Sequence, residues 1–407
     1  MDRDRLIEQA EIKLKAAFDE LDKIETENTK RVLAAFGSQR LASRHFTGTT
    51  GYGYGDEGRE ALERVYAEVF GVEAALVRPL IASGTHALAV ALFGALRPGQ
   101  TLIYATGRPY DTMEEIIGIT GSGEGSLKEF GISYKQVELK DGRVDITATL
   151  EAIDESTGLV VLQRSCGYDF RPSLSVNEIG QITAAIKAVH PHLNVMVDNC
   201  YGEFTDVIEP THVGVDLMAG SLIKNPGGGI APTGGYVAGR EELVRRCATR
   251  MTSPGIGAEV GSYSPGYRLF FQGFFMAPHT VNQAVKGAML IAQVFADMGY
   301  EVIPGPEQKR SDIIQAIKLG SPEKLVALCR AVQAASPVEA YVTPEPWEMP
   351  GYTSKVIMAA GAFVQGSSIE LSADGPLREP YAAYIQGGLT YAHVKIALEK
   401  MVDSLAQ

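Results

Sequence analysis

Lys224 is the residue of this sequence whose surroundings best suit a chemical role. It lies in the stretch Gly220-Ser-Leu-Ile-Lys-Asn-Pro-Gly-Gly-Gly229. The preceding residues include four apolar side chains: Leu217, Met218, Leu222 and Ile223. Apolar surroundings disfavour the charged ammonium and therefore lower the pKa of a lysine. A neutral amine attacks an aldehyde carbon. The alternative is that Lys224 is a surface lysine before a glycine-rich turn, without a chemical role.

A carboxylate upstream complements this lysine. Asp198 ends the apolar run Leu193-Asn-Val-Met-Val197, which predicts a buried strand of a parallel sheet. Ligands bind at the carboxyl edge of such sheets. An aspartate there can keep a pyridine nitrogen protonated, while a lysine can hold the same cofactor as a Schiff base. Asp198 and Lys224 together therefore predict a pyridoxal phosphate site, although an aspartate in this position is also a common cap or turn residue.

A phosphate site is predicted further upstream. The residues 73–82 favour a strand, and the following segment 83–93 favours a helix that begins at Ser83, Gly84 and Thr85. Free backbone amides and the helix dipole favour a phosphate at such an end. Ser221 can add a hydroxyl. Ser and Thr are equally good caps without any ligand.

The order of these motifs resembles the fold-type I pyridoxal phosphate enzymes of cysteine and methionine metabolism. The closer likeness is to the methionine γ-lyase-like subgroup, whose members carry the labels aluminium resistance protein and cystathionine β-lyase. It covers roughly residues 45–400 and is strongest at 195–201, 216–224 and 366–372.

The resemblance implies roles for individual residues. Lys224 is similar to the Schiff-base lysine, Asp198 to the partner of the pyridine nitrogen, and Tyr110 to the aromatic that stacks on the ring. The implied phosphate ligands are Ser221, Gly84 and Thr85, with Ser83 beside them. Tyr52 and Tyr54 occupy the region that reaches a neighbouring subunit's phosphate site in the family.

Two departures from the family pattern stand out. Tyr54 replaces an arginine two residues after Tyr52, and Arg59 is the nearest arginine after it. Ile223 stands before the lysine where other members often have a hydroxyl residue. Phosphate binding must therefore depend on other donors.

An arginine is expected to bind the substrate carboxylate, because its planar fork can donate two parallel hydrogen bonds. Arg378 is the first choice, since it follows a strand-like run near the carboxyl-terminal position of the family's arginine. Arg164 follows the apolar run Gly158–Leu162 and is the competitor. A single arginine is more often a solvated surface residue.

Composition excludes several function classes. The 407 residues carry a formal net charge of −12, which disfavours nucleic acid and anionic membranes as partners. Four cysteines without a Cys-x-x-Cys pair, and a charged start without an apolar signal segment, favour the reducing cytoplasm. Cys200 could act as a nucleophile, but a buried cysteine is more often a packing residue. His190 and His192 have no further ligand spacing, so we expect no metal.

The element pattern predicts an α/β protein of fold type I. Residues 1–45 favour an amphipathic helical arm whose apolar positions follow a 3.6-residue period: Leu6, Ile7, Ile12, Leu14, Ala17, Phe18, Leu21 and Ile24. Residues 46–294 predict a large domain with a doubly wound, mostly parallel sheet. Residues 295–407 predict a smaller α+β domain with strands at 300–303, 354–358 and 366–371 and a helix at 321–335. The density of aromatic residues after residue 262 favours a core or a subunit interface, and the alternative is that the loop 254–261 shapes the substrate pocket.

The hypothesis for function is a carbon-sulfur lyase acting on cystathionine, cysteine or methionine. Another pyridoxal phosphate enzyme, such as a transaminase or replacement enzyme, is the alternative within the class. A stress or metal-resistance protein with incidental catalysis is the alternative outside it. The resemblance further implies a homotetramer built from two dimers that share active sites.

Overall fold

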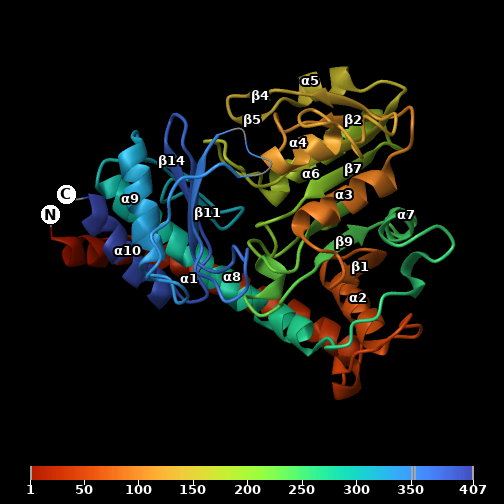
Figure 1. The fold of residues 1–407 in the computed structure, drawn as a ribbon, viewed down its shortest axis with the longest axis horizontal. Helices are drawn as coiled ribbons and strands as arrows, with labels where there is room; N and C mark the ends of the chain where they lie inside the picture. Colours follow the sequence, from red (N-terminus) through yellow and green to blue (C-terminus); the bar gives the residue numbers. More distant parts are fainter. Residues whose placement is uncertain (1, 350–351, 353, 406–407) are drawn as a thin grey trace.

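The computed structural model describes residues 2–349, 352 and 354–405, and its first element is one long helix. Helix α1 (Arg3–Ser38) is capped by Asp2, whose side chain accepts a hydrogen bond from the amide of Arg5. It packs along α8 (Arg268–Asp297), and the two helices run beneath both sheets (Figure 1). Leu6, Ile7 and Leu14 are buried as the periodicity predicts, but Ile12 is 71% exposed, so its assignment to the apolar face is wrong. Ile12 lies one position away from the residues of α1 that face α8.

The large sheet has seven strands and is mostly parallel. In spatial order the strands are β1 (Ala74–Arg78), β9 (Gly235–Gly239), β8 (Leu217–Ser221), β7 (Asn194–Asp198), β6 (Thr157–Gln163), β2 (Thr101–Tyr104) and β3 (Ser133–Gln136). The five strands from β8 to β3 are parallel, while β9 runs antiparallel to both of its neighbours. Strand β1 is shorter than the strand predicted at 73–82, because the chain turns at Pro79.

Helices cover both faces of this sheet, which confirms the doubly wound α/β prediction. Along β7, Val195 and Val197 pack into one core cluster and Met196 into the other. This alternation follows from the two-residue period of a strand. The covering helices are α2 (Glu57–Val69), α3 (Gly84–Ala95), α4 (Asp111–Ile117), α5 (Ile146–Ala152), α6 (Val176–Val189) and α7 (Glu241–Met251). The hairpin β4 (Leu139–Lys140) and β5 (Arg143–Val144) and four 3-10 turns, η1 (Ser43–Phe46), η2 (Pro210–Val213), η3 (Asn225–Gly227) and η4 (Gly257–Glu259), complete this part.

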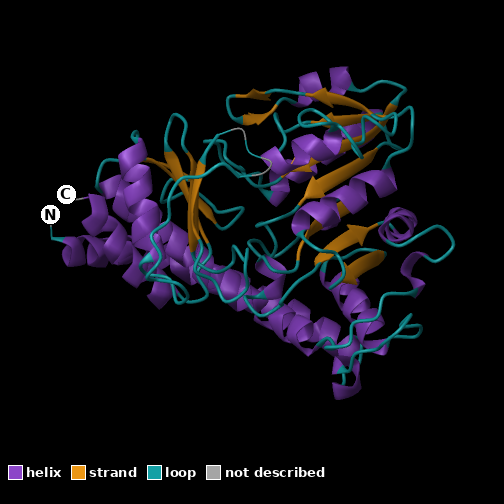
Figure 2. Cartoon of the chain, viewed as in Figure 1, coloured by secondary structure: helices purple, strands orange, loops and turns teal. Residues whose placement is uncertain are grey.

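A second sheet, fully antiparallel, follows α8 (Figure 2). Its order is β10 (Glu301–Ile303), β11 (Ile314–Lys318), β14 (Ala382–Gln386), β13 (Ser372–Pro376) and β12 (Val356–Ala359). Helices α9 (Pro322–Gln333) and α10 (Tyr391–Leu405) pack together beside it. The strand predicted at 366–371 is wrong, since that segment forms bends and β13 begins at Ser372. Glu370 explains the difference, because its carboxylate accepts hydrogen bonds from the amides of Phe363 and Val364 and holds a loop there.

The aromatic segment after residue 262 forms core. Phe270, Phe271 and Phe274 are buried, and the ring of Phe274 stacks on Tyr66 at 3.9 Å between centroids. The preceding loop is held by Arg78, which donates to the carbonyls of Ala258 and Val260. No helix in the described part of the chain is long and apolar enough to cross a membrane.

Candidate active site

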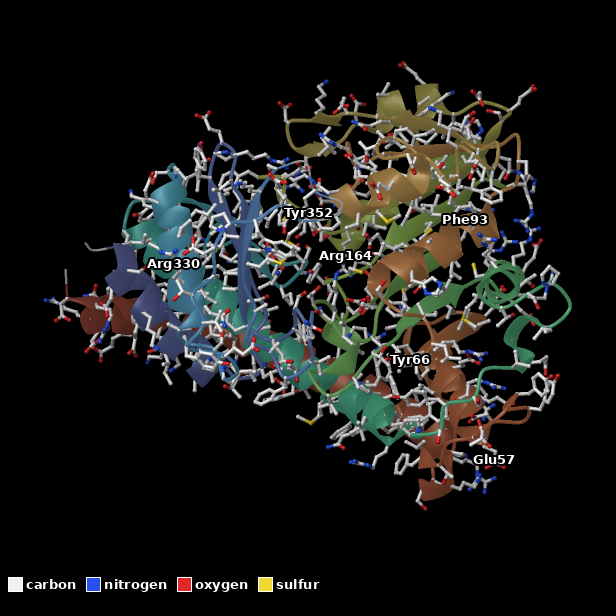
Figure 3. The ribbon with its side chains drawn as sticks, viewed as in Figure 1. Glu57, Tyr66, Phe93, Arg164, Arg330 and Tyr352 are labelled. Atoms are coloured by element: carbon white, nitrogen blue, oxygen red, sulfur yellow. The ribbon has the colours of Figure 1, made fainter. Side chains whose placement is uncertain are left out.

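A pocket lies where the carboxyl ends of β6 and β7 face the second sheet. The large sheet and its loops contribute Gly84, Thr85, Tyr110, Gln163, Tyr168, Asp198, Tyr201 and Lys224. The second sheet contributes Ile314, Asp374, Tyr384 and Gln386. Figure 3 shows the side chains that fill the space between the sheets, with Tyr352 and Arg164 labelled there. The structure therefore brings the two residues that led the sequence argument, Lys224 and Asp198, into one site.

Lys224 is positioned by the turn that follows β8. β8 ends at Ser221, and the residues directly after Lys224, Asn225 to Gly227, form the 3-10 turn η3. The side chain of Asn225 donates to the carbonyls of Tyr201 and Glu203, 2.9 Å away in each case, which fixes the turn to the end of β7. Nζ of Lys224 then lies 3.9 Å from the centroid of the Tyr201 ring. A cation over an aromatic face is stabilised by the ring quadrupole.

The pKa of Lys224 differs from the sequence prediction. Burial lowers it, as expected, but Cys200, Tyr201 and Asp198 raise it more, so the net pKa lies above the ordinary lysine value. The thiol of Cys200 and the phenol of Tyr201 have raised pKa values themselves, mainly through burial. Both are therefore neutral near pH 7, and Asp198 is the one of the three that can be an anion there. The prediction of a lowered pKa was wrong because it considered the apolar neighbours along the chain and not Cys200, Tyr201 and Asp198 across the pocket.

Asp198 stands at the carboxyl end of β7, as predicted. Its Oδ1 accepts a hydrogen bond from the amide of Cys200 at 3.1 Å. Burial raises the pKa of this carboxyl, while Lys224 and the hydrogen bond from Cys200 lower it. Cys200 beside it is buried, and burial followed by the charge of Asp198 raises the pKa of its thiol well above the ordinary value. A thiol that stays protonated is a poor nucleophile, which favours a packing role for Cys200.

Tyr110 caps the start of α4 and lines the pocket. Its amide donates to Oε1 of Gln163 at 3.0 Å, and its hydroxyl forms a 2.7 Å hydrogen bond with the hydroxyl of Tyr352. The ring of Tyr168 lies 5.7 Å away between centroids. Burial raises the pKa of Tyr110 well above its ordinary value. Tyr110 is therefore a neutral hydroxyl and a flat apolar surface at one wall of the site.

The amino end of α3 also opens into the pocket. Gly84 and Thr85 are lining residues, and as first-turn residues their amides have no acceptor inside the helix. Ser83 is used as the cap, since its Oγ accepts from the amide of His86 at 3.0 Å. Ser221 is buried beneath Gly84, where a Cβ on Gly84 would lie 3.1 Å from the Cβ of Ser221. Gly84 thus permits a close approach that a larger residue would block.

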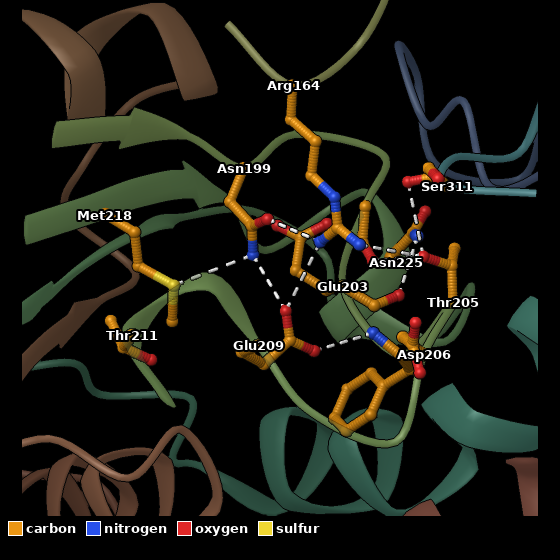
Figure 4. A network of polar contacts seen from close by, with 12 residues as sticks. Arg164, Asn199, Glu203, Thr205, Asp206, Glu209, Thr211, Met218, Asn225 and Ser311 are labelled. Atoms are coloured by element: carbon orange, nitrogen blue, oxygen red, sulfur yellow. Dashed lines mark hydrogen bonds and ion pairs between the residues drawn. The ribbon is translucent and has the colours of Figure 1, made fainter. Parts of the chain in front are cut away.

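Arg164 lies in a buried polar network and not among the pocket-lining residues (Figure 4). Its guanidinium donates to Oδ1 of Asn199 at 2.8 Å and to Thr205 at 3.1 Å, and it lies 3.5 Å from Glu209. The side chain is about 1% exposed. Its placement makes Arg164 a structural partner of Glu209 and keeps it out of the pocket lining. Strand position alone does not tell which side of the sheet edge a side chain takes.

The remaining predicted residues lie outside the pocket lining. Arg378 is half-buried in the turn between β13 and β14, and it lowers the pKa of Asp111 and Asp169, whose pKa values burial raises. Tyr52 and Tyr54 are 71% and 66% exposed, with ring centroids 5.6 Å apart. The backbone carbonyl of Tyr52 accepts a hydrogen bond from the amide of Gly261.

Sequence reasoning missed Asp374, Tyr168 and Gln386. All three line the pocket, and Gln386 donates to Oδ2 of Asp374 at 3.0 Å. Burial raises the pKa of Asp374 to about 7. An aspartate in a run of small residues before a Gly-Pro pair was the available signal, but such residues usually mark a turn. Among the described residues, no group of three His, Cys, Asp or Glu side chains could hold a metal ion.

Comparison with known proteins places this geometry in a family. The family model described as methionine gamma-lyase matches residues 3–406. The chain belongs to the methionine gamma-lyase family. The Bacillus subtilis (strain 168) protein YnbB is 53% identical over 390 residues, which cover 95% of this chain and 93% of YnbB.

Solved structures of similar chains carry lyase names. One from Listeria monocytogenes, named a "putative cystathionine beta-lyase involved in aluminum resistance", is 49% identical with a TM-score of 0.97 and covers 99% of this chain and 100% of that one. A carbon-sulfur lyase involved in aluminum resistance from Clostridium novyi NT is 49% identical, with a TM-score of 0.95 and coverage of 98% and 95%. A methionine gamma lyase from Micromonospora echinospora shares the fold at 17% identity, with a TM-score of 0.58 over 88% of this chain and 93% of that one.

Proposed function

We propose that this protein is a pyridoxal phosphate-dependent carbon-sulfur lyase acting on a sulfur amino acid. The observation that carries the proposal is the meeting of Lys224 and Asp198 in one pocket with Tyr110 and the amino end of α3. Lysine, carboxylate, aromatic wall and free helix amides are the donor set that an aldehyde, a pyridine nitrogen, a flat ring and a phosphate need. The names of the similar lyases from Listeria and Clostridium support the same reaction class.

The residues present fit this cofactor. Asp198 would face the pyridine nitrogen, Tyr110 the ring, and Gly84 and Thr85 the phosphate, with Ser83 and Ser221 at the same helix end. The bound cofactor would withdraw electrons from the substrate α-carbon. The fit at Gly84 is a matter of space, since a side chain there would meet Ser221.

Lys224 would do the proton transfers of the reaction. In its neutral form the amine would accept a proton from the substrate α-carbon and would later return it as a general acid. Asp198 would hold the pyridine nitrogen in its protonated form, which would keep the ring electron-withdrawing. Arg378, near the carboxylates of Asp111 and Asp169, would bind the substrate carboxylate.

The site would be completed by a second subunit. Tyr52 and Tyr54 form an exposed aromatic pair on this chain, which supports a role as contacts to a partner's phosphate site. We infer a dimer as the active unit and a tetramer of two such dimers. Mixing Lys224→Ala with Tyr52→Ala subunits tests this, because regained activity requires a site built from both chains.

Four buried, unbridged cysteines support a cytoplasmic location.

A spectrum followed by product assays tests the function. The purified protein with added pyridoxal phosphate should absorb in the visible range, and the band should depend on Lys224. Cystathionine, cysteine, methionine and alanine are then added in turn, and keto acid and thiol are measured. Thiol release from a sulfur amino acid supports a lyase; a visible band with amino-group transfer alone makes the protein a transaminase. Absence of any band would overturn the cofactor assignment.

A further inference from the structure

The second sheet turns one polar face toward the pocket. In the antiparallel pair β13 and β14, Asp374 stands opposite Tyr384. Side chains alternate between the faces of a strand, so Gln386 shares the face of Tyr384. All three line the pocket that contains Lys224. This wall comes from a part of the chain that none of the cofactor assignments uses.

Asp374 is buried but only partly paired. It is 8% exposed, and its Oδ2 accepts the hydrogen bond from Gln386. Its Oδ1 has no hydrogen-bond partner among the residues that the structure describes, and neither has the hydroxyl oxygen of Tyr168 on the same pocket. Tyr168 nonetheless lowers the pKa of Asp374 as a hydrogen-bonding side chain, so the two atoms lie close to each other without a hydrogen bond of good geometry. Two buried polar atoms without protein partners at one cavity indicate a place for a polar ligand group.

The charge of that group follows from the groups around it. The described pocket lining holds one cation, Lys224, and two carboxyls, Asp198 and Asp374. Burial raises the pKa of Asp374, and Lys224 is the smallest of the influences that lower it. No ion pair to Asp374 forms within the described ranges. A donor with a positive charge would both satisfy Oδ1 and stabilise the ionised carboxylate, whereas an anion would be repelled.

We propose that Asp374 binds a primary ammonium group of the substrate and selects against substrates with an anionic group at that place. The inference rests on the proposed function, in which Asp198 and Lys224 already have partners. The ammonium has two possible sources on a sulfur amino acid: the α-amino group, or a second amino group beyond the sulfur. The experiment separates these.

The test uses two ligands that differ by one charge. S-(2-aminoethyl)cysteine carries an ammonium beyond the sulfur, and S-ethylcysteine has the same thioether without that amine. Their dissociation constants are measured by isothermal titration calorimetry on the full chain with pyridoxal phosphate added, in the Lys224→Ala background that cannot turn the ligands over, with and without Asp374→Asn. Asparagine keeps an acceptor for Gln386 and removes the charge. Asp154→Asn is the matched control, since it removes the same charge from a half-exposed residue outside the pocket lining.

Each result supports or overturns the proposal. Loss of a charge-assisted hydrogen bond should weaken binding by about 10- to 100-fold. Weakening of S-(2-aminoethyl)cysteine alone assigns Asp374 to the distal ammonium, and equal weakening of both ligands assigns it to the α-ammonium. Unchanged binding of both overturns the proposal. If Asp374→Asn unfolds, Asp374→Ser is used as the second neutral variant.

Failure of the proposed function remains distinguishable. Calorimetry detects binding without cleavage and without a coloured species. Thiol release is measured separately on the unaltered protein. A protein that binds both ligands through Asp374 but releases no thiol refutes the lyase and retains the ammonium site; thiol release with no effect of Asp374→Asn refutes the site and retains the lyase.

Discussion

Two buried groups of charges lie within a few residues of each other at the ends of β6 and β7, and they have different roles. Gln163 and Asp198 are register partners on the two strands, and both line the pocket. The next residues, Arg164 and Asn199, lie in the network with Glu209 (Figure 4). One step along each strand therefore separates the candidate catalytic groups from a structural network.

The difference between these groups lies in pairing and not in burial. Arg164 and Glu209 are both about 1% exposed or less and lie 3.5 Å apart as an ion pair. In the described part of the chain, Lys224, Asp198 and Asp374 form no such pair, and they line an open cavity. A buried charge that the protein itself neutralises holds the fold together. A buried charge that faces a cavity without a close opposite charge is available to a ligand.

The largest effect should follow from Lys224→Ala. If Lys224 carries the proton transfers, its loss should reduce turnover by about 10³-fold or more, because no other base is placed at that position. Steady-state thiol release and circular dichroism measure activity and folding. Lys187→Ala is the control, since Lys187 pairs with Asp216 away from the pocket. Near-normal turnover in the Lys224 variant would contradict a catalytic role for Lys224, and with it the contrast between the pocket charges and the network of Arg164.

Arg164→Met should act on stability. It leaves Glu209 buried without its cation, which should lower the free energy of unfolding by about 3–5 kcal/mol. Urea unfolding followed by fluorescence measures this. Arg246→Met is the matched control, because Arg246 forms an exposed ion pair with Glu242 that should contribute below about 1 kcal/mol. A small effect at Arg164 would mean that its network is not what stabilises this edge of the sheet.

Arg378→Ala tests the other predicted arginine. Loss of a carboxylate-binding cation should raise KM by about 10-fold with little change in kcat, because the interaction contributes equally to the ground state and the transition state. Unfolding should change little, since the side chain is only half-buried. Unchanged KM would assign carboxylate binding to another residue.

The smallest effect is expected for Glu203→Gln, which should change how the unfolding free energy depends on pH. Burial raises the pKa of Glu203 from 4.5 to about 8, and the hydroxyl of Tyr236 donates to its Oε1 at 2.7 Å. A carboxyl with a raised folded-state pKa stabilises the fold fully below pH 4.5, and this contribution is lost as pH rises toward 8. From pH 7 to 8 the unaltered protein should lose about 1 kcal/mol of unfolding free energy through this group.

Glutamine cannot ionise but keeps an acceptor for Tyr236. The Glu203→Gln variant should therefore show a flatter dependence of unfolding free energy on pH, measured by urea titration at pH 6, 7 and 8. Parallel curves for the two proteins would place the titrating group elsewhere.

Much of the architecture could be predicted from local patterns. The apolar run ending at Val197 and the run 158–162 became β7 and β6, since continuous apolar segments suit a strand that is buried on both faces. The segment predicted at 366–371 failed because the carboxylate of Glu370 binds backbone amides there, and a side chain that competes for the backbone is not visible in a hydrophobic pattern. The prediction for the pKa of Lys224 failed for a related reason: the groups that raise it, Cys200, Tyr201 and Asp198, lie on a different segment of the chain.

The sequence by itself determined most of the strands and helices and placed Asp198 at a strand end and Lys224 before a glycine-rich turn, because apolar periodicity and turn residues act over a few neighbouring positions. Only the tertiary structure decided that Arg164 pairs inward with Glu209, while Asp374 faces the pocket of Lys224. Alternation along a strand tells which side chains share a face. Which face meets the cavity depends on how the second sheet packs against the first, and that is set by contacts between segments far apart in the chain.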